Sequence, residues 1–296
     1  MSLLEAIVLG LVQGLTEFLP ISSTAHLRIV PALLGWADPG AAYSAVIQLG
    51  TTAAVILYFA KDLAQLTRAF VVGLKERKPF GTTDSRLAWF VGLGTIPIGL
   101  LGLLFKKRIE TSLRSLWVIA ISLIVLALVL AVVERLSKRT RTLDQMTLTD
   151  GLIIGLWQAL ALIPGSSRSG TTLTGGFSLG FTRADAARYS FLLSIPATGL
   201  AGLFELKHLV EASDRPAMSL LALGTLVSFA TGLAAIWGLL RFLRTRSTRV
   251  FIVYRVLAGT ALLLALNAGA LSPDAGRTPA DANALKDAGL TGGANP

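Results

Sequence analysis

One stretch of the sequence reads Gly10-Leu-Val-Gln13-Gly-Leu-Thr-Glu17-Phe-Leu-Pro20-Ile-Ser22-Ser23-Thr-Ala-His26. It carries a carboxylate, two serine hydroxyls and an imidazole within an apolar segment that extends over residues 2–34. Proline disfavours helical backbone at the preceding residue and has no N–H to donate, so the stretch predicts a helix, a break and a second helix. Inside a membrane, such a break has to be buried in protein or line a polar cavity.

The composition of the chain indicates a membrane protein. Its 296 residues are 53% hydrophobic and only 15% charged, whereas a soluble domain carries about 25% charged residues. Mean hydropathy is +0.67, which excludes an ordinary soluble enzyme. The lack of cysteine excludes thiolate chemistry, and two histidines are too few for a histidine-rich metal centre.

Six segments are long and apolar enough to cross about 30 Å of hydrocarbon as helices. They are Gly40–Ala60, Leu87–Phe105, Ser115–Val133, Ala186–Leu206, Ala217–Leu240 and Val256–Ser272. The expected fold class is therefore an all-α polytopic membrane protein with about six transmembrane helices. Two interrupted apolar segments, residues 2–34 and 151–180, are expected to be re-entrant helix-loop-helix elements.

The two interrupted segments resemble each other. Gly155-Leu-Trp-Gln158 aligns with Gly10-Leu-Val-Gln13, and Pro164-Gly-Ser166-Ser167 aligns with Pro20-Ile-Ser22-Ser23 after a gap of one residue. The two segments begin on opposite sides in the predicted topology. This arrangement is typical of an inverted-topology repeat, in which broken helices mark a site at the repeat interface.

We expect one membrane domain, residues 1–272, with repeat halves of about 1–110 and 150–272. Residues 273–296 are rich in Ala, Gly, Asp and Pro and lack an apolar period, which indicates a disordered tail. The net charge of +10 is concentrated at span ends, so a nucleic-acid surface is not expected. By the positive-inside rule, the more basic ends are cytoplasmic and both termini lie outside the cytoplasm.

The polar side chains of the first motif can share one site. Gln13 and Glu17 are four residues apart and lie on one helix face. Ser22 and Ser23 follow the break, where they can cap the next helix, and His26 can share a face with Ser23. The alternative is interfacial, with a carboxylate at a helix end, a capping serine and a satisfied histidine. Ionisable groups within a membrane are costly and usually functional, which favours a site.

The second motif runs from Pro164 to Thr172 and supplies hydroxyls, glycines and one guanidinium at a helix N-terminus. Backbone N–H groups and the helix dipole favour an anion there. Arg168 adds a fork of donors that matches phosphate geometry, although a snorkelling arginine is the alternative. The candidate phosphate-binding residues of the two motifs are Ser22, Ser166, Ser167, Ser169 and Thr172.

These motifs resemble the signatures of a known family. Gln13-x-x-x-Glu17 and Pro164-Gly-x-Ser167-Arg168-Ser169-x-x-Thr172, together with Ser23 and His26, are similar to the signature pair of the undecaprenyl-diphosphate phosphatases, also called bacitracin-resistance proteins. The resemblance extends from about Leu3 to Leu271. It implies hydrolysis of undecaprenyl diphosphate to undecaprenyl phosphate and inorganic phosphate, which recycles the lipid carrier for peptidoglycan synthesis. It also implies the bacterial cytoplasmic (inner) membrane, an active site that faces the extracytoplasmic side, and a divalent cation.

Residue types suggest a role for each member of the site. Mg²⁺ or Ca²⁺ would be held through Glu17, with Gln13 offering a neutral oxygen where the family often has a second glutamate. Arg168 would stabilise the transferred phosphoryl group. Ser23 is the preferred nucleophile, with His26 as its proton acceptor. A phosphohistidine on His26 and water activated directly by His26 are the alternatives.

The expected partners are undecaprenyl diphosphate and membrane lipids, and a homodimer is allowed. A transporter or flippase of an anionic lipid or solute is the alternative function, because secondary transporters also use inverted repeats with broken helices. In that case Glu17 and His26 would relay protons while Arg168 binds the anion. The Ser23–His26 pair favours a hydrolase. Gln48, a lone amide in the first span, is expected mainly to join helices by hydrogen bonding.

Overall fold

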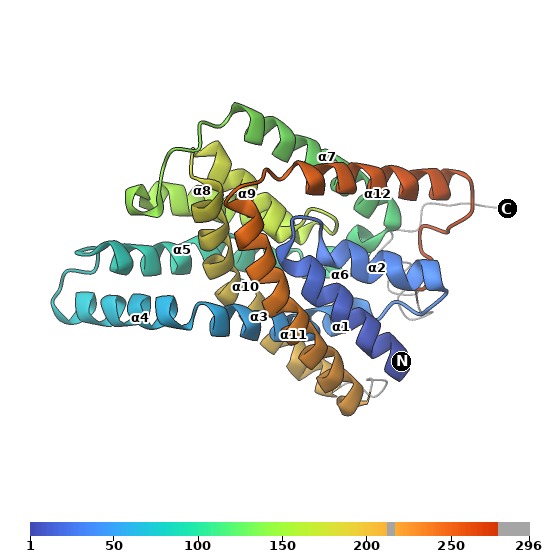
Figure 1. The fold of residues 1–296 in the computed structure, drawn as a ribbon. Coiled ribbons are helices and arrows are strands. Elements are labelled where there is room, and N and C mark those ends of the chain that lie inside the picture. The colour runs from blue at the N-terminus through green and yellow to red at the C-terminus, as the bar shows by residue number, and fades with distance from the viewer. Residues whose placement is uncertain (212–216, 278–296) are drawn as a thin grey trace.

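The structure, a computed structural model, describes residues 1–211 and 217–277, and Figure 1 shows their arrangement as a bundle of helices. Within the described residues, the only contact of β type is an isolated bridge between Arg141 and Phe181. The helices are α1 (Leu3–Phe18), α2 (Ser23–Leu34), α3 (Gly40–Tyr58), α4 (Ala60–Lys75), α5 (Thr83–Leu104), α6 (Lys106–Glu110), α7 (Leu116–Leu136), α8 (Leu148–Ala159), α9 (Arg168–Ser178), α10 (Arg183–Glu211), α11 (Met218–Leu243) and α12 (Arg249–Asn267).

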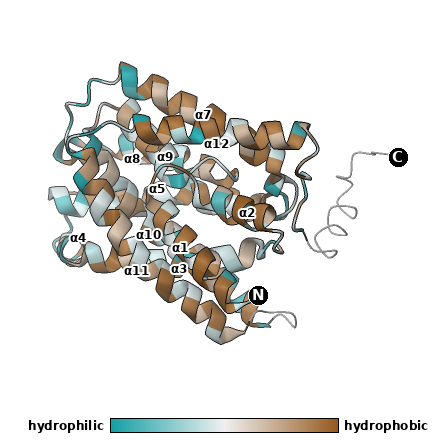
Figure 2. Cartoon of the chain, turned by 45° about the vertical axis from the view of Figure 1, so that its right-hand side comes forward, coloured by the Kyte–Doolittle hydropathy of each residue, from teal (hydrophilic) through white to brown (hydrophobic). Residues whose placement is uncertain are grey.

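The six predicted spans are confirmed as helices long and apolar enough to cross a membrane. They are α3, α5, α7, α10, α11 and α12. Figure 2 shows hydrophobic residues over much of the helix surfaces and hydrophilic residues mainly on the connections and helix ends. Exposed leucines on these helices, such as Leu103 and Leu257, therefore lie on the surface that contacts lipid in a membrane protein.

The first interrupted segment forms helices α1 and α2 with a break between them, as predicted. Helix α1 ends at Phe18, and Leu19 is extended because Pro20 follows it. Ser22 then has a positive φ of +76°, and its hydroxyl accepts a hydrogen bond from the backbone N–H of Ala25. The turn therefore ends with a serine cap that starts α2.

The second interrupted segment repeats this local geometry. Helix α8 ends at Ala159, and Ile163 is extended before Pro164. Ser167 has a φ of +68° and its hydroxyl accepts from the N–H of Gly170. The capping serines are thus Ser22 and Ser167, whereas the sequence alignment pairs Ser22 with Ser166. The second turn has one more residue between its proline and its cap than the first turn.

Close backbone contacts bring each re-entrant element against a long helix. A Cβ atom added to Gly10 of α1 would lie 2.6 Å from the carbonyl oxygen of Gly224 in α11, and one added to Gly155 of α8 would lie 2.3 Å from that of Gly94 in α5. Small residues allow helix backbones to approach in this way. The aligned glycines therefore have corresponding packing roles, and the inverted repeat stays a prediction. Helices α7 and α12 lie side by side at another edge of the bundle (Figure 1).

The start of the predicted tail is hydrogen-bonded to the helical domain. The carbonyl of Pro273 accepts from the N–H of Leu116 (3.1 Å), and the carbonyl of Gly276 accepts from that of Asp38 (2.7 Å). Residues 278–296 of the predicted tail lie outside the described residues. The boundary at residue 272 stays a prediction, as does the orientation of the chain in the membrane.

Candidate active site

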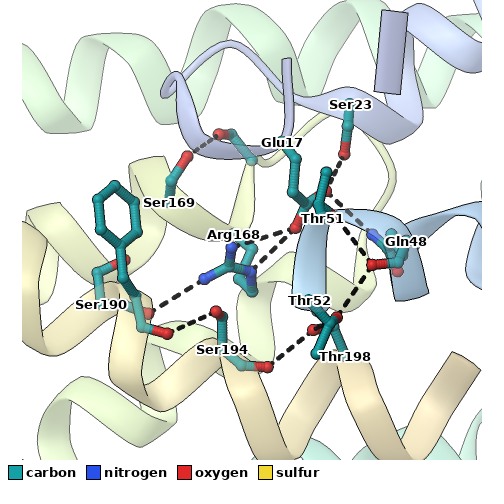
Figure 3. Close-up of polar contacts among 12 residues, drawn as sticks. Glu17, Ser23, Gln48, Thr51, Thr52, Arg168, Ser169, Ser190, Ser194 and Thr198 are labelled. Carbon is teal, nitrogen blue, oxygen red and sulfur yellow. Dashed lines mark hydrogen bonds and ion pairs between the residues drawn. The ribbon is translucent and has the colours of Figure 1, made fainter. Parts of the chain in front are cut away.

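The two re-entrant elements meet at their breaks, and this places the two sequence motifs in contact. The hydroxyl of Ser169 in α9 donates to the carbonyl of Leu19 in the first break (3.0 Å). Beside this contact, Arg168 at the start of α9 pairs with Glu17 near the end of α1 (Figure 3). Residues 151 positions apart thus form one polar centre.

Glu17 is the hub of this centre. Its side chain is 3% exposed, and its Oε1 accepts from Nη2 and Nε of Arg168 at 3.1 and 3.3 Å. Its Oε2 accepts from the Ser23 hydroxyl at 2.7 Å and from the amides of Gln13 and Gln48 at 3.0 and 3.1 Å. A buried carboxylate needs hydrogen-bond donors to replace the water that it loses, and here both oxygens have them.

Arg168 is held so that part of its guanidinium stays available. Its Nη1 donates to the carbonyl of Ser190 in α10 at 3.2 Å, and its side chain is 9% exposed. An arginine has five N–H groups, and the contacts with Glu17 and Ser190 use three of them. The other two can bind phosphate oxygens at the N-terminus of α9, where the helix dipole also favours an anion.

The remaining hydroxyls of the second motif order the N-terminal turn of α9. Ser167 caps the helix and lies 3.2 Å from the hydroxyl of Ser169, and Thr172 bonds to the hydroxyl of Ser190 at 2.6 Å. Ser166 is fully buried, and within the part of the chain that the structure describes its hydroxyl has no hydrogen-bond partner. Of these four residues of the motif, only Ser167 lines the large cavity described next.

The polar centre lies at one side of a cavity of about 740 Å³. Glu17, Ser22, Ser23, Ser167 and Arg168 line it, and most of its wall is apolar. The apolar part includes Leu103 of α5 and Leu200 and Leu203 of α10, which are also 60–70% exposed on the surface of the bundle. A molecule with an anionic end and a long apolar chain fits this distribution of polar and apolar groups.

Charged side chains also line the cavity away from the polar centre. Lys106 of α6 pairs with Glu205 of α10 at 2.8 Å and with Glu110 at 3.5 Å. Burial raises the pKa of Glu110 above its ordinary value. The Lys106–Glu205 pair connects α6 to α10 at this part of the cavity wall, whereas the Lys106–Glu110 pair lies within α6.

The expected pairing of Ser23 with His26 does not match the structure. The Ser23 hydroxyl donates to Glu17. The Nδ1 of His26 donates to the carbonyl of Ser22 (2.7 Å), and its Nε2 is hydrogen-bonded to the Tyr254 hydroxyl (2.5 Å). His26 does not line the cavity. The two side chains are close in sequence, but one turns to α1 and the other to α12.

Besides Ser190, other residues outside the motifs contact members of the motifs. Gln48 was expected mainly to join helices, yet its amide donates to Glu17 and lines the cavity. Tyr254 contacts His26, and Arg255 bonds to the second loop. A lone amide within an apolar span is a usable signal for the first of these, whereas the partners of Tyr254 and Arg255 are set by long-range packing.

The donor set can be tested against the expected divalent cation. The described residues contain no group of three or more histidine, aspartate or glutamate side chains that could hold a metal ion. Gln13 is fully buried and, unlike Glu17, does not line the cavity. Its Oε1 has no hydrogen-bond partner among the described residues, while its amide nitrogen lies 3.0 Å from Glu17. One carboxylate and one free amide oxygen fit a cation that takes its other ligands from substrate phosphates and water, as Mg²⁺ commonly does.

The fold and this site define a polytopic membrane protein equipped to bind a phosphorylated amphipathic molecule. Residues 6–261 match the family described as Bacitracin resistance protein BacA, and the chain belongs to this family. It is 68% identical over 276 residues to the undecaprenyl-diphosphatase of Myxococcus xanthus (strain DK1622), covering 93% of each chain. It is 54% identical to that of Chloroherpeton thalassium, covering 92% of this chain and 99% of the relative. For that of Nocardioides sp. (strain ATCC BAA-499 / JS614), the identity is 50% and the coverage 91% and 98%.

Proposed function

We propose that this chain hydrolyses undecaprenyl diphosphate to undecaprenyl phosphate and inorganic phosphate. The observation that supports this most directly is the group formed by Glu17, Ser23 and Arg168 at one side of a largely apolar cavity. The cavity suits a lipid, the guanidinium suits a phosphate, and the hydroxyl suits a nucleophile. Family membership and the names of the relatives support the phosphatase over a transporter or flippase.

The geometry favours Ser23 as the nucleophile and Glu17 as its proton acceptor. Their oxygens are 2.7 Å apart, within reach for general-base catalysis. The Ser23 oxygen would bond to the terminal phosphorus while the bond from that phosphorus to the bridging oxygen breaks, which releases undecaprenyl phosphate. Water would then attack the phosphorus of the phosphoserine while the bond from that phosphorus to the serine oxygen breaks, and Glu17 would return the proton to the serine oxygen. Inorganic phosphate would leave with the oxygen and both protons of the water, as dihydrogen phosphate. Because His26 lies outside the cavity lining, a phosphohistidine is the less favoured alternative.

Arg168 is the group best placed to stabilise the transferred phosphoryl. Phosphoryl transfer depends mainly on positioning and electrostatic stabilisation of the equatorial oxygens. Two N–H groups of Arg168 are not used by Glu17 or Ser190. The carboxylate of Glu17 fixes the guanidinium plane, so the arginine would meet the substrate in a preset orientation.

A divalent cation, Mg²⁺ or Ca²⁺, completes the proposal. Gln13 would hold it through the unpartnered Oε1, and Glu17 would hold it through its carboxylate. When bound, the cation would neutralise charge on the diphosphate. The protein is proposed to lie in the bacterial cytoplasmic membrane with this site facing the extracytoplasmic side, and a homodimer is compatible with the proposal.

The test is phosphate release by the purified protein from undecaprenyl or farnesyl diphosphate, with and without EDTA. We expect one phosphate for each lipid diphosphate, loss of release in EDTA, and no release from undecaprenyl monophosphate. Ser23→Ala is the matched inactive control. Absence of release from either diphosphate in saturating Mg²⁺ and Ca²⁺ would reject the proposed function. Transport of a lipid or an anion without hydrolysis would support the transporter instead.

A further inference from the structure

Arg255 in α12 is among the largest fully buried side chains of the protein, with 0% exposure. Within residues 1–211 and 217–277, no carboxylate forms an ion pair with it. A buried charge without a counter-charge is costly, and an apolar side chain of similar length would fill the space without that cost. The contacts of the guanidinium therefore need a different explanation from packing.

Those contacts are with backbone carbonyls of the second re-entrant turn. Nη2 of Arg255 donates to the carbonyl oxygens of Ser166 at 3.0 Å and Gly165 at 3.1 Å, and to that of Ser122 in α7 at 3.3 Å. The hydroxyl of Ser122 donates to the carbonyl of Pro164 at 2.5 Å. Three successive carbonyls of the turn are thus bonded to side chains from α7 and α12.

The bonded turn leads directly into the phosphate-binding end of α9. Gly165 has a φ of +95°, and Ser167 has one of +68°, a region that side-chain-bearing residues seldom adopt. Such a backbone persists only when its surroundings hold it. Arg168 follows this segment immediately, so a shift in the turn would move its guanidinium relative to Ser23 and Glu17.

We propose that Arg255 is a positioning residue, which holds the 164–166 turn so that Arg168 meets the substrate in the reactive geometry. The proposal rests on the proposed phosphatase function. Arg255 does not line the cavity, so it acts through the turn and not by touching substrate. All three carbonyl contacts are made by Nη2, whereas Nε and Nη1 have no hydrogen-bond partner among the described residues. A lysine side chain is one bond shorter than that of arginine, so its ammonium would fall short of the carbonyls. The length of the arginine side chain, and not only its charge, is therefore required.

The kinetic test compares Arg255→Lys with the wild type and with Arg249→Lys. Arg249 begins the same helix and is exposed, so it provides the same substitution away from the turn. We expect Arg255→Lys to lower kcat at least tenfold while KM stays within about twofold, and Arg249→Lys to behave as wild type. Wild-type kcat in Arg255→Lys would overturn the proposal, as would a rise in KM with kcat unchanged. Adding Ser122→Ala to Arg255→Lys should lower kcat by less than the product of the two separate effects, because both side chains hold one turn.

A second measurement does not depend on catalysis. The chain contains no cysteine, so Ser166→Cys introduces a single thiol into the turn at a fully buried position. We expect a maleimide to label this thiol at least tenfold faster in the Arg255→Lys background than in Ser166→Cys alone or in Ser166→Cys combined with Arg249→Lys. Equal labelling rates would overturn the positioning role. Failure of the wild type to hydrolyse lipid diphosphates would instead reject the proposed function. The labelling rates would still show whether Arg255 holds the turn.

Discussion

Replacing Glu17 by glutamine tests the hub of the site, because it removes one acceptor and the charge but keeps the size of the side chain. If the new NH₂ group replaces Oε2, it meets the donating amides of Gln13 and Gln48. Each buried donor left unpaired costs about 1–3 kcal/mol. In either orientation the new side chain is neutral, so the guanidinium of Arg168 loses its only ion-pair partner among the described residues, which costs about 3–5 kcal/mol. Glu17→Gln should therefore lose at least about 3–5 kcal/mol of stability, and its turnover.

The assay is thermal unfolding of detergent-solubilised protein, with phosphate release measured on the same preparation. Glu76→Gln is the matched control, since Glu76 is an exposed glutamate at the end of α4 and should melt and turn over as wild type. Glu17→Gln should melt clearly below both. A wild-type melting temperature would refute the reasoning about the hydrogen-bond network. Retained turnover in the folded variant would refute the role of Glu17 as proton acceptor.

Five other perturbations probe the same centre. Arg168→Lys keeps the charge but loses the forked arrangement of N–H donors. Steady-state phosphate release should therefore show kcat and kcat/KM lowered together by roughly 10²-fold. Normal kinetics with a lower melting temperature would mean that the arginine has only a structural role. Ser23→Ala should abolish release yet cost only about 0.5–1.5 kcal/mol in the same thermal assay, since it removes one hydrogen bond to Glu17; continued turnover would indicate another nucleophile. EDTA should stop turnover, and activity that is insensitive to chelation would reject the cation. Gln13→Glu should lower the cation concentration that gives the half-maximal rate. If that concentration is unchanged, Gln13 is not a ligand of the cation. Gln48→Leu removes the hydrogen bond that the Gln48 amide donates to Glu17 and should lower kcat more than it changes KM. An unchanged kcat would mean that Gln48 serves only in helix packing.

Much of the fold could be predicted because its signals are local. Uncharged apolar runs marked five of the six spans, and the sixth, Ala186–Leu206, has charges only near its ends. Pro20 and Pro164 marked the breaks in the two re-entrant elements. The predicted start of the last span was too late in the sequence. It was expected to begin at Val256, just after a charged residue, whereas α12 begins at Arg249. The carbonyls of a distant turn allow Arg255 to lie buried within the helix, and no local rule contains that information.

The site was predictable in its members but less so in their pairing. Glu17 and Arg168 come together because their motifs sit on broken helices that meet. The partner of His26 could not be inferred from its spacing to Ser23, since the rotation of α2 about its axis depends on packing. That rotation points the ring toward Tyr254, 228 residues away. Long-range helix packing therefore decides which neighbour in sequence becomes a neighbour in space.

Leu103 and Leu203 belong both to the cavity wall and to the outer surface of the bundle. A lipid diffusing in the plane of the bilayer could thus reach the cavity without crossing the aqueous phase. The encounter would then be a two-dimensional search, governed by the number of substrate molecules per unit area of membrane. Adding detergent or inert lipid at fixed bulk substrate would dilute that surface and slow the reaction. Apparent KM values for this protein are therefore best expressed as mole fractions of the amphiphile, and inert lipids with bulky acyl chains would compete for the same entrance.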